Sequence, residues 1–181
     1  MIYSTLQVLF NHTIRDLVVA EKRIIREIPK LIEGASSSEL KILLGAYAEE
    51  RALDISNVER VLSAHNISLE TAHAKSVDAL IRQAHDIAEK RGDQFLLDIE
   101  LISVVRRWEE LQKAGYEFAC LCAETLGYSD FTESVSNVIL HINKLECSML
   151  VLLEDILDSI HPEALEISQK NVVDKGVSYE G

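Results

Sequence analysis

Residues 15–28 read RDLVVAEKRIIREI, and one acidic position interrupts the apolar face of this stretch. Leu17, Ile24 and Ile28 recur at the spacing of a single α-helical face. Glu21 lies in line between them. A carboxylate that faces a protein core is costly unless it is paired, protonated or bound to a cation. The stretch therefore predicts an amphipathic helix that carries a polar site into the protein interior.

Two other helical stretches show the same anomaly. Glu50 and Asp54 lie in line with Tyr47 on an otherwise apolar face. Glu109 lies in line with Tyr116 in the same way. Three helices that each direct carboxylates inward are typical of a metal site inside a helical bundle.

The spacing of apolar residues is helical along almost the whole chain, since glycine and proline are scarce and no stretch alternates with period two. It predicts helices over residues 5–33, 39–65, 76–90, 94–126 and 131–160. The connection between the second and third long helices is too long for a turn between antiparallel neighbours, so we expect a crossover along the bundle. The pattern therefore predicts an all-α fold, a ferritin-like four-helix bundle with a long crossover that carries a short extra helix.

The ends of the helices also carry signals. Asn66 and Gly127 follow long helices and tolerate the left-handed conformation that ends a helix, and Asp93 is expected to cap the helix after it. Pro162 is expected to end the last helix, because proline disfavours helical geometry in the residue before it. We therefore predict that residues 1–161 form the bundle and that residues 162–181 form a polar, loosely ordered C-terminal tail.

The composition limits the possible partners. A net charge of −12 argues against binding to nucleic acid or to anionic membranes, which needs a basic face. No uncharged run approaches the roughly 20 residues of a membrane-spanning helix, and the start of the chain lacks the basic segment of a signal peptide. We therefore expect a cytoplasmic protein that binds neither nucleic acid nor a membrane.

Several short motifs resemble those of one family. They are Arg15-Asp16-Leu17, Ala20-Glu21-Lys22, Ile28-Pro29-Lys30, Ser38-Glu39-Leu40-Lys41, Glu49-Glu50 and Ala114-Gly115-Tyr116. Their order and spacing resemble the bacterial YciE/YciF family of ferritin-like proteins, which are associated with stress responses. The likeness runs from Phe10 to Leu157. It implies a four-helix bundle that dimerises and that holds, in typical members, a pair of metal ions between its helices.

The resemblance assigns candidate ligands on the first three long helices. A di-iron carboxylate centre takes roughly six protein ligands from four helices. Glu21 matches the first-helix ligand, Glu50 the second-helix ligand and Glu109 the third-helix ligand. Asp54 stands where the family often has histidine or glutamine, and Gln112 occupies a position that is usually acidic.

The last helix departs from the family pattern. Leu145 and Met149 take the positions that are acidic in typical members. His141 and Glu146 lie near that face, but about 100° of helical rotation away from it. A site for two iron or manganese ions would therefore be incomplete, and a single ion held by Glu21, Glu50 and Glu109, with or without Asp54, is the alternative form of the metal site. As an alternative to a metal, Glu21 would hydrogen-bond a buried partner such as Arg51, Arg106 or Tyr116.

Two functions follow from these alternatives. We favour a stress-associated, non-enzymatic dimeric scaffold with a degenerate or partial carboxylate metal site, because apolar residues on the last helix cannot hold iron. The other is an iron- or manganese-binding redox protein that reacts with dioxygen or peroxide.

A homodimer is also predicted. The last helix is apolar on nearly every side over a short segment that contains Val151, Leu152, Leu153, Ile156 and Leu157. A helix that is apolar on most faces needs a second surface to cover it, which another copy of the chain would provide.

Overall fold

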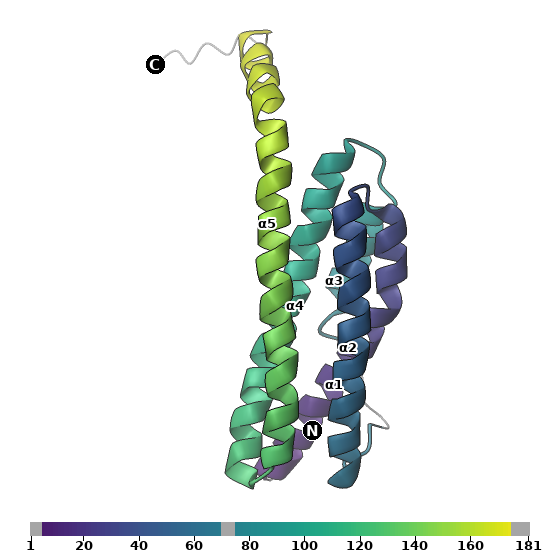
Figure 1. Ribbon diagram of the computed structural model, residues 1–181, viewed down its shortest axis with the longest axis vertical. Coiled ribbons are helices and arrows are strands. Elements are labelled where there is room, and N and C mark those ends of the chain that lie inside the picture. The colour runs from purple at the N-terminus through teal and green to yellow at the C-terminus, as the bar shows by residue number, and fades with distance from the viewer. Residues whose placement is uncertain (1–4, 70–74, 175–181) are drawn as a thin grey trace.

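The computed structural model describes residues 5–69 and 75–174, and Figure 1 shows that this part of the chain is built from helices. The elements are α1 (Leu6–Gly34), α2 (Ser38–Ala64), α3 (Asp78–Ala88), α4 (Gln94–Leu126) and α5 (Ser129–Asp174). No strand occurs among the described residues. The predicted all-α class is confirmed.

The four long helices form a bundle in which α1 and α5 each pack against both α2 and α4. The end of α1 meets the start of α4, since Ser36 N donates to Asp98 Oδ1 at 2.9 Å. The end of α2 meets the start of α5, since His65 Nε2 lies 2.9 Å from Asp130 Oδ1. Neighbouring helices are therefore antiparallel, whereas α2 and α4 run in the same direction. The crossover between them carries α3 along α1 and α4, and this is the predicted ferritin-like arrangement.

The helix ends follow the predicted signals. Asp93 caps α4 and accepts hydrogen bonds from the backbone of Phe95 and Leu96. Asn66 adopts a φ of 57° after α2, and Gly127 adopts a φ of 78° after α4. Both values lie in the left-handed region that stops a helix.

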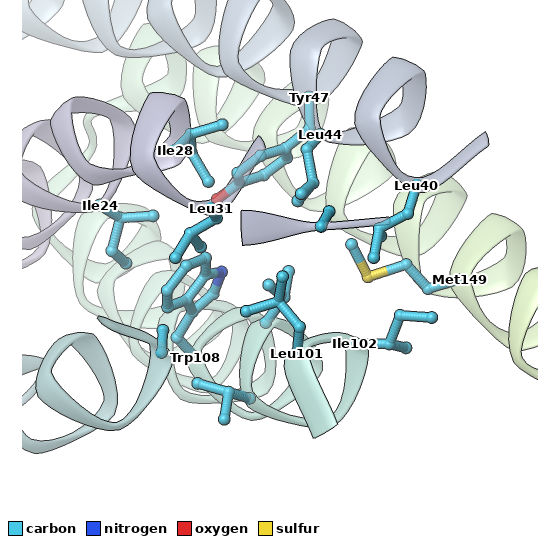
Figure 2. Close-up of a cluster of buried hydrophobic side chains, with 14 of the residues drawn as sticks. Ile24, Ile28, Leu31, Leu40, Leu44, Tyr47, Leu101, Ile102, Trp108 and Met149 are labelled. Atoms are coloured by element: carbon cyan, nitrogen blue, oxygen red, sulfur yellow. The ribbon is translucent and has the colours of Figure 1, made fainter. Parts of the chain in front are cut away.

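The core is divided into two apolar clusters, and Figure 2 shows the first, in which Trp108 and Tyr47 lie among aliphatic side chains. The second cluster fills the other half of the bundle. On each long helix, the boundary between the clusters lies between one residue of the first cluster and one of the second. The residues of the first cluster at this boundary are Ala20, Tyr47, Trp108 and Leu145. Those of the second cluster, in the same helix order, are Val18, Ile55, Tyr116 and Ile142. The boundary lies at one level across all four helices, and that level holds the candidate site.

The C-terminal helix is longer than predicted. α5 continues through Pro162 to Asp174 and extends beyond the ends of the other helices (Figure 1). The predicted helix end before Pro162 is therefore wrong. Proline removes one backbone hydrogen bond from the helix. The residues that follow, EALEISQK, are mainly good helix formers, which favours continuation of the helix past this point. The loose order of the tail stays a prediction, and residues 175–181 lie outside the described residues.

The apolar character of α5 extends over much of its length. Its segment Ser129–Ser159 is long and apolar enough, by length and composition alone, to cross a membrane, and 28% of the apolar window is buried in the bundle. The core helix of a soluble bundle can share this composition. Within this segment, the large apolar side chains of α5 that the single bundle leaves exposed are Leu140, Leu150, Val151 and Leu157.

Substitution of two glycines, Gly34 and Gly45, tests the packing of α3 against α1. A Cβ atom on Gly34 would lie 2.5 Å from Ala88 Cβ and 2.7 Å from Ala88 Cα, so α1 and α3 cannot both keep their positions. Gly34→Ala should lower the free energy of unfolding by about 1–3 kcal/mol through overpacking. Gly45→Ala, whose Cβ would meet nothing within 4 Å, should instead raise it by up to about 1 kcal/mol. Urea unfolding of both variants checks this pair, and a stabilised Gly34→Ala would contradict the packing of α3.

Candidate functional site

A layer of buried polar side chains separates the two apolar clusters. α1, α2 and α4 each contribute to it. Its most buried members are at most 5% exposed and comprise Glu21, Arg51, Asp54, Glu109 and Gln112. Four of the five predicted site residues are therefore buried in the bundle interior.

Arg51 lies at the centre of this layer. Its Nη2 donates to Oε1 of Glu21, and both side chains are almost completely buried. Its Nη1 lies 3.5 Å from the carbonyl oxygen of Val138 and 3.9 Å from Oδ2 of Asp54. The guanidinium thus bridges α1, α2 and α5. Among the three partners proposed for Glu21 from the sequence, the structure selects Arg51.

Asp54 carries the layer to the protein surface. Its Oδ2 lies 2.8 Å from Nδ1 of His141 on α5, whose side chain is 25% exposed. The helical pattern placed His141 away from the ideal inner face, but an imidazole is long enough to reach a carboxylate from the edge of that face. α5 therefore contributes a histidine to the site.

Glu109 belongs to a separate hydrogen bond within the layer. The hydroxyl of Tyr47 donates to its Oε1 at 2.5 Å. Burial raises the pKa of Glu109 above its ordinary value, and the nearby charge of Arg51 and the hydrogen bond from Tyr47 offset only part of this effect. Burial and the charge of Glu109 likewise hold the pKa of Tyr47 well above its usual range. The protonated form of Glu109 is therefore favoured relative to an exposed glutamate.

Two predicted ligands have other placements. Glu50 is exposed, and the prediction that it faces the core is wrong. The buried face of α2 runs through Tyr47, Arg51 and Asp54, and Glu50 lies about 100° from Arg51 around the helix. Gln112 is buried, and its Nε2 donates to the carbonyl oxygen of Leu17 at 3.2 Å. It therefore joins α4 to α1 rather than approaching Arg51.

The side chains of this layer do not fit a pair of metal ions. The guanidinium already neutralises Glu21 and lies near Asp54, so an added cation would compete with a fixed positive charge. Leu145 and Met149 are buried apolar residues on α5. Within residues 5–69 and 75–159, no group of three or more histidine, cysteine, aspartate or glutamate side chains is arranged to hold a metal ion. The layer is a polar network with an arginine as its cation.

A family of domains of unknown function, DUF892, matches residues 5–166. The chain belongs to this family. Protein YciF of Escherichia coli K12 is 27% identical over 126 residues, which are 69% of this chain and 76% of YciF. The match confirms the predicted relationship to the YciE/YciF family.

Two solved structures share the fold. The crystal structure of the E. coli stress protein YciF gives a TM-score of 0.82 at 22% identity, and the match covers 86% of this chain and 99% of that chain. YcfI from Rhodopseudomonas palustris, described as a candidate structural protein, gives a TM-score of 0.76 at 24% identity. This match covers 82% of the present chain and 97% of the YcfI chain. The similarity to these two structures confirms the predicted ferritin-like bundle.

The contribution of Arg51 can be measured by a double-mutant cycle. Arg51→Met leaves Glu21 buried without its cation and should lower the free energy of unfolding by about 3–5 kcal/mol. Combining it with Glu21→Leu should restore most of that loss, because two apolar side chains need no partner. The exposed pair Lys22–Glu59 joins the same two helices, so Lys22→Met is the control and should cost less than about 1 kcal/mol. Equal effects of Arg51→Met and Lys22→Met would contradict the buried pairing.

The raised pKa of Glu109 predicts a pH dependence. The unfolded carboxyl loses its proton near 4.5, whereas the folded one retains it to higher pH. The free energy of unfolding therefore falls as the pH rises from about 4.5 toward the raised pKa. Glu109→Gln removes this loss, so its stability relative to the native protein should increase as the pH rises above about 4.5. Chemical unfolding between pH 4 and 8 checks this, with the exposed Glu117→Gln as control. A gain that shrinks with rising pH would show that Glu109 is ionised and paired.

Proposed function

We propose that this protein is a non-enzymatic, dimeric scaffold associated with the stress response, in which a buried arginine supplies the positive charge at the centre of the bundle. The observation that carries this proposal is the guanidinium of Arg51 between Glu21 and Asp54. A carboxylate that balances a fixed internal cation is not free to bind a metal ion and to shift as the metal changes oxidation state. The chemistry of a carboxylate redox centre needs that freedom.

The remaining groups support the same proposal. A neutral carboxyl is a poor metal ligand, and burial favours the neutral form of Glu109. Glu50 is exposed to solvent on the outside of α2. A complete set of hard, anionic ligands is therefore not assembled from the predicted residues. The fold alone carries no activity, because ferritin-like bundles hold unrelated sites.

The association with stress rests on the relatives. YciF of E. coli is described as a stress protein, and YcfI of R. palustris as a candidate structural protein. A structural role for the present chain agrees with a bundle whose central layer is occupied by an ion pair. A cytoplasmic location agrees with the acidic composition and with three cysteines that form no disulfide, namely Cys120, Cys122 and Cys147.

The second candidate function is an iron- or manganese-binding redox protein that reacts with dioxygen or peroxide. One observation favours it. Oε2 of Glu21 and Oε2 of Glu109 are buried and lack a hydrogen-bond partner within the described part of the chain. Free carboxylate oxygens in a core are the groups that bind cations most readily. The positive charge of Arg51 opposes such binding, and metal analysis separates the two functions.

The metal content of the purified protein is the decisive experiment. Protein expressed with added iron and manganese, and purified without chelators or a metal-affinity tag, should contain almost no metal by elemental analysis. One or two tightly bound iron or manganese ions per chain would overturn the scaffold proposal. Dioxygen and peroxide consumption would then be measured on the metal-loaded protein.

The proposed dimer rests on an apolar surface shared by α2 and α5. A groove of about 400 Å³ lies between these helices and is lined in part by Ile42, Leu43, Val151 and Leu152. Ile42 is 72% exposed and Val151 is 59% exposed. Large apolar side chains at this density are costly in water, so a second copy of the chain would cover them.

The oligomeric state tests this surface. Light scattering coupled to size-exclusion chromatography should give twice the chain mass for the native protein. Ile42→Glu combined with Val151→Glu should give the monomer mass, because each glutamate would be buried at the interface. Leu121→Glu, at a 64% exposed position on α4 outside the groove, should leave the dimer intact. A native monomer would contradict the dimer, and a native monomer that floats with lipid vesicles would assign the apolar surface of α5 to a membrane.

A further inference from the structure

The buried layer has the plan of a two-metal carboxylate centre. In ferritin-like di-metal bundles, two helices supply one glutamate each, and the other two supply a glutamate and a histidine at spacing i, i+3. The present chain has single glutamates in the layer on α1 and α4, which are Glu21 and Glu109. The two remaining helices, α2 and α5, should therefore be examined for pairs at spacing i, i+3.

α2 presents such a pair in Arg51 and Asp54, and α5 presents one in Val138 and His141. The structure brings the two pairs together. Arg51 Nη1 is 3.5 Å from the carbonyl oxygen of Val138, and Asp54 Oδ2 is 2.8 Å from Nδ1 of His141. Arg51 also pairs with Glu21. Residues at three of the four helix positions of the di-metal plan thus contact one another, and Glu109, at the fourth position, lies buried in the same layer within the electrostatic influence of Arg51.

We infer that Arg51 and Val138 occupy the two glutamate positions of a two-metal centre, and that the guanidinium is an internal replacement for the metal charge. This inference rests on the proposed function, because it explains why the layer needs no metal. It also relocates the last-helix positions, which the sequence pattern had placed at Leu145 and Met149. Those two residues lie in the first apolar cluster, to one side of the layer.

Two features of the layer support this inference. Oε2 of Glu21 and Oε2 of Glu109 are buried without a hydrogen-bond partner among the described residues, so one oxygen of each carboxylate is left for another ligand. Asp54 and His141 hold the second positions of the two i, i+3 pairs, and Oδ2 of Asp54 lies 2.8 Å from Nδ1 of His141, so both groups already face the same point of the layer. The features that prevent metal binding are then a positive charge at one position and an apolar side chain at another.

The inference predicts that two substitutions create metal binding. Arg51→Glu combined with Val138→Glu removes the internal cation and adds two carboxylates, so the variant should bind about two Mn(II) or Co(II) ions per chain. Bound Co(II) should show visible absorption bands, and the ions should raise the melting temperature. Arg51→Met, which removes the cation without adding a ligand, is the matched control and should bind no ion tightly.

Each outcome has a separate meaning. A native protein that binds metal would overturn the proposed function. A native protein without metal, together with a folded double variant that binds no more Co(II) than Arg51→Met, would overturn this inference alone. The five carboxylates of the double variant can prevent folding without metal, so its helix content is measured by circular dichroism with and without Mn(II).

A single substitution keeps the inference testable if the double variant does not fold in either condition. Arg51→Glu alone should bind about one Co(II) ion through the carboxylates of α1 and α2 and the imidazole of His141. A folded Arg51→Glu protein without saturable Co(II) binding would then overturn the inference. Loss of that binding on adding Glu21→Gln or His141→Phe would locate the ion in this layer.

Discussion

The ion pair between Arg51 and Glu21 is the interaction on which the centre of this bundle depends. Both charges are removed from water at the level where the two apolar clusters meet. Neither charge is tolerable there alone, because the desolvation of a single buried ion costs several kcal/mol. Each side chain therefore requires the other, and the requirement fixes the positions of α1 and α2 relative to each other. The carbonyl oxygen of Val138 extends the same constraint to α5.

The rest of the layer follows from this pair. Arg51 lies near Asp54, which in turn holds His141, so that one positive charge organises groups from three helices. Glu109, on α4, accepts a hydrogen bond from the hydroxyl of Tyr47, and burial raises the pKa of its carboxyl. The result is a polar layer in which the positive charge of Arg51 lies near the carboxylates of Glu21 and Asp54. Under the proposed function, this internal positive charge takes the place that metal ions have in a carboxylate centre.

Hydrophobic periodicity predicted the fold well because each long helix has one continuous apolar face. It also directed Glu21, Asp54 and Glu109 into the core correctly. It failed at Glu50 and Arg51, which are adjacent and both charged, since the pattern gives no preference between a buried acid and a buried base. His141 was underestimated because a side chain at the edge of a helix face can reach inward. The spacing of Arg51 and Asp54, compared with the glutamate and histidine pairs of di-metal bundles, was the signal that could have found the layer.

The most direct test of an internal cation is a crystal structure of the native protein grown with Mn(II) and recorded near the manganese absorption edge. We expect guanidinium density against Glu21 and no anomalous peak between the four long helices. An anomalous peak coordinated by Glu21 and Glu109, with Arg51 turned away from them, would contradict this expectation. In that case the layer would be a metal centre, and the arginine would be a mobile neighbour of the ions rather than their replacement.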